Sequence, residues 1–180
     1  MTINLKNFLN TKPKISKMGE FQELKPIDGL EISSYSADLY KNGRDDIALF
    51  YFKEGANYAA LYTTNSITSQ TIEWNKKSNK SFTKGLLVNT KNANTFTGDN
   101  GLESIDVLAK NLSRILTIRE SKSDEGVSET VKIKDLLFAS TGVIGEKFPT
   151  EKIVSSLQNL VDKLRDDHNK LIWIKTASAI

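Results

Sequence analysis

The spacing of apolar residues along the chain predicts two long helices. Between Glu103 and about Arg119, and again after Pro149-Thr150, apolar side chains recur every three or four residues. Thr150 suits the cap position at the start of the second helix. Each pattern places an apolar stripe on one face of a helix, which would pack against a sheet. The stripes comprise Ile105, Leu108, Leu112, Ile115 and Leu116, and then Ile153, Leu157, Leu160, Val161 and Leu164.

Shorter apolar runs predict strands between and before these helices. Two of them, 46–52 and 58–63, flank a turn at 54–57 and are predicted to pair as a hairpin. Lysine- and serine-rich residues predict exposed loops at 74–82 and 120–130, and a further helical segment is predicted from Leu171 to Ile180. The other predicted strands begin near Leu30 or cover 85–89 and 136–139.

Composition narrows the class of protein. The chain has 180 residues, of which 38% are apolar and 26% charged, as in water-soluble globular domains. The N-terminal residues lack the continuous apolar segment of a secretory signal, so a cytoplasmic protein is expected. The net charge of +3 is spread along the chain, which disfavours a nucleic-acid groove. Without cysteine there is neither a disulfide framework nor a thiolate metal site.

Two acidic clusters invite a catalytic or metal-binding interpretation. In Asp45-Asp46 the second carboxylate is a candidate catalytic group, but neighbouring side chains in a turn or strand point apart, which favours a structural role. Asp166, Asp167 and His168, the only histidine, lie side by side in a polar helix end. They cannot all converge on one ligand, so no metal site is predicted there.

Two strands run directly into loops rich in small polar residues. Residues 85–101 begin as a strand and continue through an Asn-, Thr- and Gly-rich loop, and residues 136–146 repeat the design. Such loops turn tightly and leave backbone N–H groups exposed, which suits an anionic group. In Ser140-Thr141-Gly142, the Thr141 hydroxyl and the Gly142 N–H have the chemistry to stabilise an oxyanion during acyl transfer. The alternative is that both segments are ordinary turns.

Together these segments resemble the N-terminal part of the bifunctional ornithine acetyltransferase/glutamate N-acetyltransferase (ArgJ) family. Residues 88–98 are similar to the family's Asn-Ser-Gly-Asn-Ala-Asn-Ala-Cys-Thr-Gly segment, and residues 140–146 to its Ser-Thr-Gly-Val-Ile-Gly segment. Residues 41–49, 59–65 and 173–180 also match in order and spacing. The resemblance covers most of the chain after about Met18.

The resemblance implies a fold, a reaction and a site. The fold is an α/β (α+β) four-layer αββα sandwich of the self-processing type. The reaction moves acetyl from N-acetylornithine to glutamate in arginine biosynthesis, with acetyl-CoA as an additional donor in some members and no other cofactor. The oxyanion hole maps onto Thr141 and Gly142, and Asn89, Asn92 and Asn94 are candidate residues of a pocket loop. The active form is an oligomer of paired chains made by self-cleavage at a nucleophilic Thr.

This sequence departs from the family pattern at two points. Lys91 stands where the family has Gly, which puts the shape of that loop in question. The family's nucleophilic Thr would follow Ile180, so residues 18–180 are interpreted as the N-terminal portion of an acetyltransferase domain truncated before the nucleophile, behind a loosely attached arm at 1–17. This chain alone is therefore expected to be inactive and to pair with a C-terminal chain. The alternatives are an inactive remnant that binds a small molecule or another chain, and a related self-cleaving amidase or aminopeptidase.

Overall fold

One four-stranded sheet organises the protein. The computed structural model describes residues 25–78, 80–123, 130–167 and 170–180. Neighbouring strands pair antiparallel from β1 to β3, whereas β4 runs parallel to β3. The strands, in their order across the sheet, are β1 (Leu30–Tyr35), β2 (Ile47–Asn57), β3 (Phe82–Asn89) and β4 (Leu136–Ser140).

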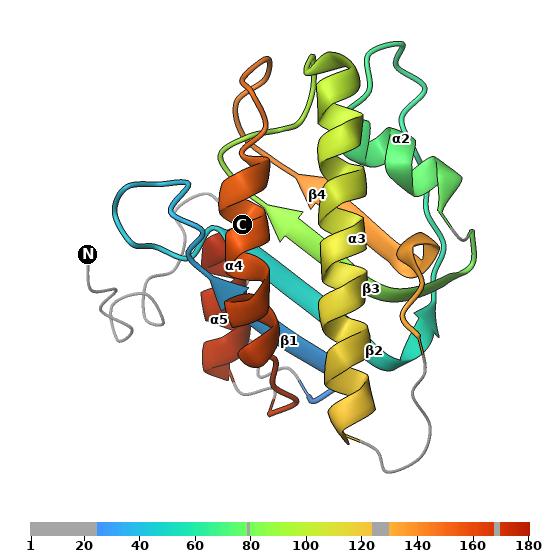
Figure 1. Cartoon of the computed structure of the whole chain (residues 1–180), viewed down its shortest axis with the longest axis vertical. Coiled ribbons are helices and arrows are strands. Elements are labelled where there is room, and N and C mark those ends of the chain that lie inside the picture. The colour runs from blue at the N-terminus through green and yellow to red at the C-terminus, as the bar shows by residue number, and fades with distance from the viewer. Residues whose placement is uncertain (1–24, 79, 124–129, 168–169) are drawn as a thin grey trace, which may run out of the picture.

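Helices cover the sheet unequally. The long helix α3 (Gly98–Ser123) forms most of the crossover that parallel pairing of β3 and β4 requires, and it lies beside α4 (Thr150–Asp162) across one face (Figure 1). Helix α5 (Lys170–Ala179) packs against β1, and α2 (Gln70–Lys77) packs against β4. A 3-10 turn, η1 (Ile133–Asp135), precedes β4. The mixed α/β class is confirmed.

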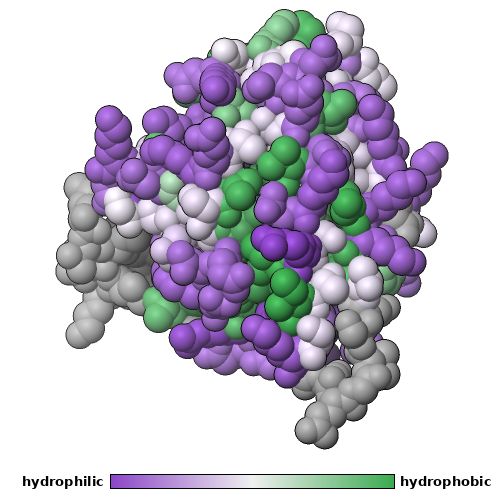
Figure 2. All heavy atoms as spheres, viewed as in Figure 1, coloured by the Kyte–Doolittle hydropathy of each residue, from purple (hydrophilic) through white to green (hydrophobic). Residues whose placement is uncertain are grey.

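The two predicted helical stripes form the core. Leu108 and Leu112 of α3 and Leu157 of α4 are at most 1% exposed and belong to one buried cluster with the sheet residues Leu49 and Leu87. The outward faces of both helices are mainly hydrophilic, with a narrow apolar strip between them (Figure 2). Both amphipathic predictions are confirmed.

The opposite face of the sheet is covered at its β1 side by α5. Side chains alternate along a strand, so Ile32 and Ala48 point away from the cluster beneath α3 and α4. Both are 0% exposed, as Ile174 of α5 nearly is at 3%, and α5 packs against both strands. The described residues thus form one sheet of the two that the resemblance implied.

Three sequence predictions are wrong. Thr150 does not cap α4: it is the first residue of that helix, the cap position is Pro149, and no side chain caps the helix start. Residues 58–63 form no strand: β2 continues to Asn57, and after a register shift between Tyr51 and Ala56 it pairs with β3 instead. Residues 74–82 are not an exposed loop, because α2 occupies their first half and β3 begins at Phe82. The Ser69 hydroxyl accepts a hydrogen bond from the N–H of Ile72 and so caps α2.

Some predictions concern residues outside those described. The arm proposed for residues 1–17, the middle of the loop at 120–130 and His168 lie there. Within the described residues, no group of acidic or histidine side chains is arranged to hold a metal ion. No helix in the same part of the chain has the length and apolarity that crossing a bilayer requires.

Candidate active site

The two polar loops identified in the sequence leave the sheet side by side. Strands β3 and β4 are parallel neighbours, and their last residues, Asn89 and Ser140, are partners in the register. The chain therefore enters both loops at the same edge of the sheet, where parallel strands commonly present ligand-binding loops. This pairing brings the two strand-to-loop junctions together at one edge of the sheet.

Backbone hydrogen bonds join the loops beyond the strand ends. The N–H of Val143 donates to the carbonyl of Lys91 at 2.8 Å, and the N–H of Ala93 donates to the carbonyl of Val143 at 2.9 Å. Further along, the Gly145 N–H donates to the carbonyl of Thr95 at 2.9 Å. The loops thus behave as one paired unit continuing the parallel ladder.

Gly142 lies where the two loops approach most closely. Its φ of 133° belongs to the region that L side chains rarely adopt. A Cβ atom there would lie 2.2 Å from the carbonyl carbon of Lys91 and 2.7 Å from the amide nitrogen of Asn92. Both contacts involve backbone atoms, so no side-chain rotation relieves them. Only glycine fits this position without moving a loop.

The two predicted oxyanion donors lie at the surface next to each other. Thr141 and Gly142 are both exposed, and the Thr141 N–H donates to the carbonyl of Asn89 at 3.0 Å. Across the part of the chain that the structure describes, neither the Gly142 N–H nor the Thr141 hydroxyl has a hydrogen-bond partner. An N–H and a hydroxyl from consecutive residues are therefore available to an external acceptor.

The three asparagines of the proposed pocket loop are buried rather than exposed. Asn89, Asn92 and Asn94 are 4%, 3% and 0% exposed. The Asn89 carboxamide accepts from the Ser140 hydroxyl at 2.6 Å and donates to the carbonyl of Asn92 at 3.0 Å, which ties the two strand ends together. These side chains hold the loops in shape from beneath.

Asn92 and Asn94 extend this support to the rest of the loop. The Asn92 carboxamide donates to the carbonyl of Glu146 at 3.0 Å and accepts from the N–H of Asn94 at 2.9 Å. The Asn94 carboxamide donates to the carbonyl of Gly101 at 3.2 Å in the first turn of α3. The loop is thereby fixed to both its neighbours, and rigid donors cost little reorganisation when charge develops.

The loop departs from ordinary backbone geometry at several residues. Lys91, Asn94 and Phe96 have φ values of 70°, 47° and 57°. Lys91 therefore occupies a left-handed conformation at the position where the family pattern has Gly. The Lys91 carbonyl accepts a hydrogen bond from the N–H of Val143, which helps to hold this conformation.

An apolar rim borders the exposed donors. Phe96, Val143 and Ile144 are 65%, 48% and 59% exposed. All three come from the two paired loops, and Val143 directly follows Gly142. None of the three residues was predicted to belong to the site. Their signal is an apolar side chain inside a loop otherwise made of small polar residues.

Asp46, the residue just before β2, supports the site and is structural. Its carboxylate accepts from the N–H groups of Ala37 and Leu39, each at 2.7 Å, and of Tyr40 at 3.3 Å. Its carbonyl accepts from the N–H of Thr90 at 3.0 Å. The carboxylate is fully buried and occupied, which confirms the structural interpretation of this residue.

The chain resembles known proteins along most of its length. The model of the ArgJ family matches residues 31–180. The arginine biosynthesis bifunctional protein ArgJ of Pseudomonas fluorescens is 30% identical over 163 residues, and that of Caulobacter vibrioides 29% over 164. These alignments cover 91% and 89% of this chain but only 36% of each relative.

Solved structures agree at the level of the fold. The ornithine acetyltransferase of Mycobacterium tuberculosis, crystallised with ornithine, superposes with a TM-score of 0.75 at 20% identity, over 86% of this chain and 76% of that one. The ArgJ protein of Bacillus halodurans gives 0.64 at 19% identity, over 76% and 68%. With the family model spanning five sixths of its residues, this chain belongs to the ArgJ family.

Proposed function

We propose that this chain supplies the oxyanion-binding part of a glutamate N-acetyltransferase that moves acetyl from N-acetylornithine to glutamate in arginine biosynthesis. One observation carries the proposal: the Gly142 N–H and the Thr141 hydroxyl are exposed, adjacent and without partners among the described residues. Family membership supplies the reaction class. The chain's relatives include an arginine biosynthesis bifunctional protein and an ornithine acetyltransferase that was crystallised with ornithine.

The two donors act where negative charge develops. When a hydroxyl nucleophile adds to the acetyl carbonyl of N-acetylornithine, the carbonyl oxygen becomes an oxyanion. Gly142 and Thr141 donate hydrogen bonds to it and lower the barrier. The C–N bond then breaks as the ornithine nitrogen takes up a proton, which leaves an acetyl ester. The glutamate amine adds to that ester through a second oxyanion held by the same donors. The ester C–O bond then breaks, the nucleophile's oxygen takes up the proton that the amine loses, and N-acetylglutamate is released.

The nucleophile belongs to a further part of the enzyme in this proposal. The resemblance assigns it to a Thr outside residues 1–180, at the start of a second chain, in an oligomer of paired chains in the cytoplasm. The apolar rim formed by Phe96, Val143 and Ile144 supports this arrangement, because covering it would also exclude water from the donors. Acetyl-CoA is a second candidate donor, and no other cofactor is proposed.

The proposal predicts that residues 1–180 alone do not turn over N-acetylornithine. The test joins Ile180 to the segment of the Pseudomonas fluorescens relative that follows its matched region, and measures acetyl transfer to glutamate by both proteins. The joined protein should transfer acetyl to glutamate, whereas residues 1–180 alone should not. Turnover by the chain alone would refute this division of the site.

Substitutions at Thr141 test the oxyanion role in the joined protein. Thr141→Val removes the hydroxyl at constant shape and should lower kcat by about 10²-fold, as the loss of one oxyanion donor does elsewhere. Thr141→Ser keeps the hydroxyl and is the matched control. Equal kcat values for the valine and serine variants would exclude Thr141 as a donor.

An inactive binding chain is the second candidate function. The observation that favours it is that no nucleophile–base pair lies beside Thr141 among the described residues. A joined protein that binds N-acetylornithine, melts cooperatively and shows no acetyl transfer would support it. Hydrolysis of amino-acid amides in place of acetyl transfer would instead support the related amidase.

A further inference from the structure

A cleft lies at the free edge of the sheet, away from the candidate active site. Its volume is about 350 Å³, within the range of small-molecule sites. It lies between β1, the segment after α4 and the start of α5, whereas Thr141 follows β4 at the other edge. Three strand spacings, roughly 14 Å, separate the two edges. Its polar lining residues are Ser33, Ser34, Lys163, Arg165, Asp167 and Lys175.

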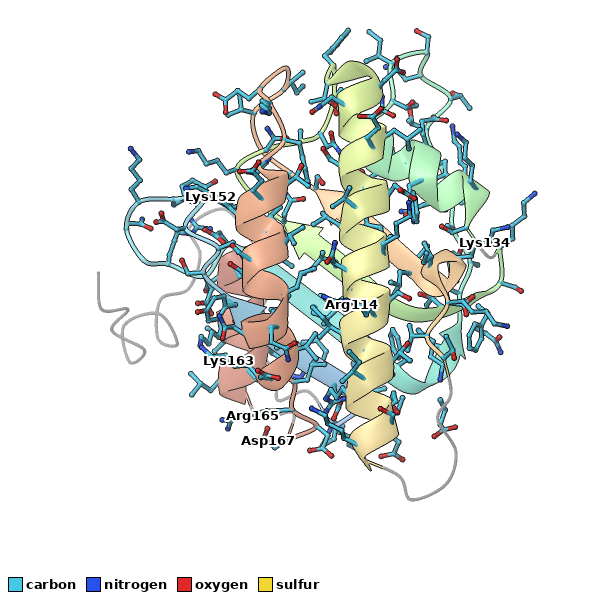
Figure 3. The ribbon with its side chains drawn as sticks, in the orientation of Figure 1. Arg114, Lys134, Lys152, Lys163, Arg165 and Asp167 are labelled. Carbon is cyan, nitrogen blue, oxygen red and sulfur yellow. The ribbon has the colours of Figure 1, made fainter. Side chains whose placement is uncertain are left out.

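Positive charge dominates this lining. Three of its side chains are cationic, Lys163, Arg165 and Lys175, and one, Asp167, is anionic, which leaves a formal charge of +2 (3 − 1). Lys163 and Arg165 come from the segment that leaves α4, close to Asp167 (Figure 3). Lys175 approaches from α5. The cleft therefore favours an anionic ligand.

The cations differ in how far they are already engaged. Lys175 pairs with Asp45 at 3.3 Å, and the Lys163 ammonium lies 4.5 Å above the ring centre of Tyr35. The Arg165 guanidinium makes no ion pair or hydrogen bond within the described residues. Its planar fork is thus free to bind a carboxylate or phosphate in bidentate fashion.

Ser33 lines the cleft from the edge strand, but its hydroxyl does not face the cations. Its register partner Leu49 belongs to the cluster beneath α3 and α4, so the Ser33 side chain points to that face of the sheet, away from α5. Its Oγ is fully buried and makes no hydrogen bond in the described structure. The donors of the cleft therefore come from its cations and the edge of β1.

The edge of β1 offers one more donor. The N–H and carbonyl of Ile32 point away from β2 and bond the backbone of Arg165, at 2.9 and 3.2 Å. Backbone groups alternate along a strand, so those of Ser34 face the same outer edge. The Ser34 N–H has no acceptor there within the described residues, because the pairing with the segment after α4 ends at Arg165.

We propose that this cleft binds a small organic acid through a carboxylate or phosphate group, held by Arg165 and the backbone N–H of Ser34 and attracted by Lys163 and Lys175. Asp167 lines the same cleft, and its negative charge disfavours a ligand of high negative charge. Its carboxylate accepts a hydrogen bond from a donor group of the bound acid. The site is separate from the acyl-transfer site and does not depend on the proposed function.

Calorimetric titration of the purified protein tests the site with three probes: succinate, inorganic phosphate and neutral succinamide. Succinate or phosphate should bind, more weakly as salt is raised, and succinamide should not. Binding of succinate alone identifies a carboxylate site, and binding of phosphate alone a phosphate site. Equal binding of all three probes overturns the proposal. So does the absence of binding by every probe at concentrations up to about 10 mM.

Two variants locate the binding. Arg165→Gln should weaken it at least 10-fold, whereas Lys134→Gln, an exposed cation elsewhere on the surface, should leave it unchanged (Figure 3). Unchanged affinity in Arg165→Gln would exclude this cleft.

Discussion

Replacing Gly142 by alanine should separate the two loops that form the candidate active site. The added Cβ would meet the carbonyl carbon and oxygen of Lys91 at 2.2 and 2.3 Å and the nitrogen of Asn92 at 2.7 Å. Real Cβ contacts do not occur at such distances, and all three atoms are backbone. The loops must therefore move apart, which breaks the two hydrogen bonds of Val143 to Lys91 and Ala93.

The size of the effect follows from two contributions. A side chain at φ 133° adds about 1–3 kcal/mol of backbone strain. Loss of two loop hydrogen bonds adds about 1 kcal/mol each. Relaxation of the exposed loops relieves part of the strain, so we expect Gly142→Ala to lower the free energy of unfolding by about 3 kcal/mol.

Gly145→Ala provides the matched control. Gly145 also has a positive φ, 80°, but a Cβ there would have no atom within 4 Å. Its substitution should cost only the conformational strain, about 1 kcal/mol. In thermal unfolding followed by circular dichroism, Gly142→Ala should melt about 4–8 °C below Gly145→Ala. Equal melting temperatures would refute the close approach of the two loops.

Three further substitutions probe the supports of the sheet. Asp46→Asn should lower the free energy of unfolding by about 2 kcal/mol in urea titrations, because its buried carboxylate accepts three backbone N–H groups; an unchanged midpoint would contradict this. Arg119→Met should cost about 3 kcal/mol, since it leaves the buried Glu31 without its bidentate partner, whereas Arg114→Met on the exposed face of α3 should be nearly neutral. Burial and, to a smaller extent, the Glu120 carboxylate raise the pKa of the Tyr51 phenol above its usual 10.0. The neutral phenol therefore stabilises the folded protein fully below about pH 10, and this stabilisation declines as the pH rises further. Stability curves from pH 8 to 11 should fall less steeply for Tyr51→Phe than for the unmodified protein, and parallel curves would exclude this origin.

Local patterns were sufficient to predict the elements that pack through apolar stripes. The residues of α3 and α4 that recur every three or four positions are the ones that line the core, because a helix can bury only one face against a sheet. The meeting of the two polar loops was also predictable. Each follows a strand, and neighbouring parallel strands end at one edge.

Contacts between distant residues explain why the loop predicted at 74–82 is wrong. Helix α2 contains two lysines and an asparagine, residues typical of a loop, yet the Asn75 carboxamide bonds both the N–H and the carbonyl of Phe138, at 3.0 and 2.8 Å. The Trp74 indole donates to the carbonyl of Leu136 at 3.0 Å. Both interactions cap the free edge of β4 from more than 60 positions away, and no local pattern reveals them.

Burial of polar side chains was the least predictable property of the site. An asparagine-rich loop suggests side chains directed at a ligand, but Asn89, Asn92 and Asn94 are directed into the protein. A loop of exposed backbone donors needs internal carboxamides, because its own carbonyls and N–H groups cannot all pair with each other. The side chains that look most like ligand contacts therefore fix the backbone that the proposed site uses.

The left-handed Lys91 shows the same dependence on long-range pairing. A lysine at φ 70° is about 1 kcal/mol less favourable than glycine, so local preference alone would not choose this conformation. The Lys91 carbonyl accepts from Val143 and lies against Gly142 in the other loop. Pairing between the loops thus outweighs the preference of the residue. The geometry of the Gly142 donor is for that reason a property of both loops together, and a change in either should alter it.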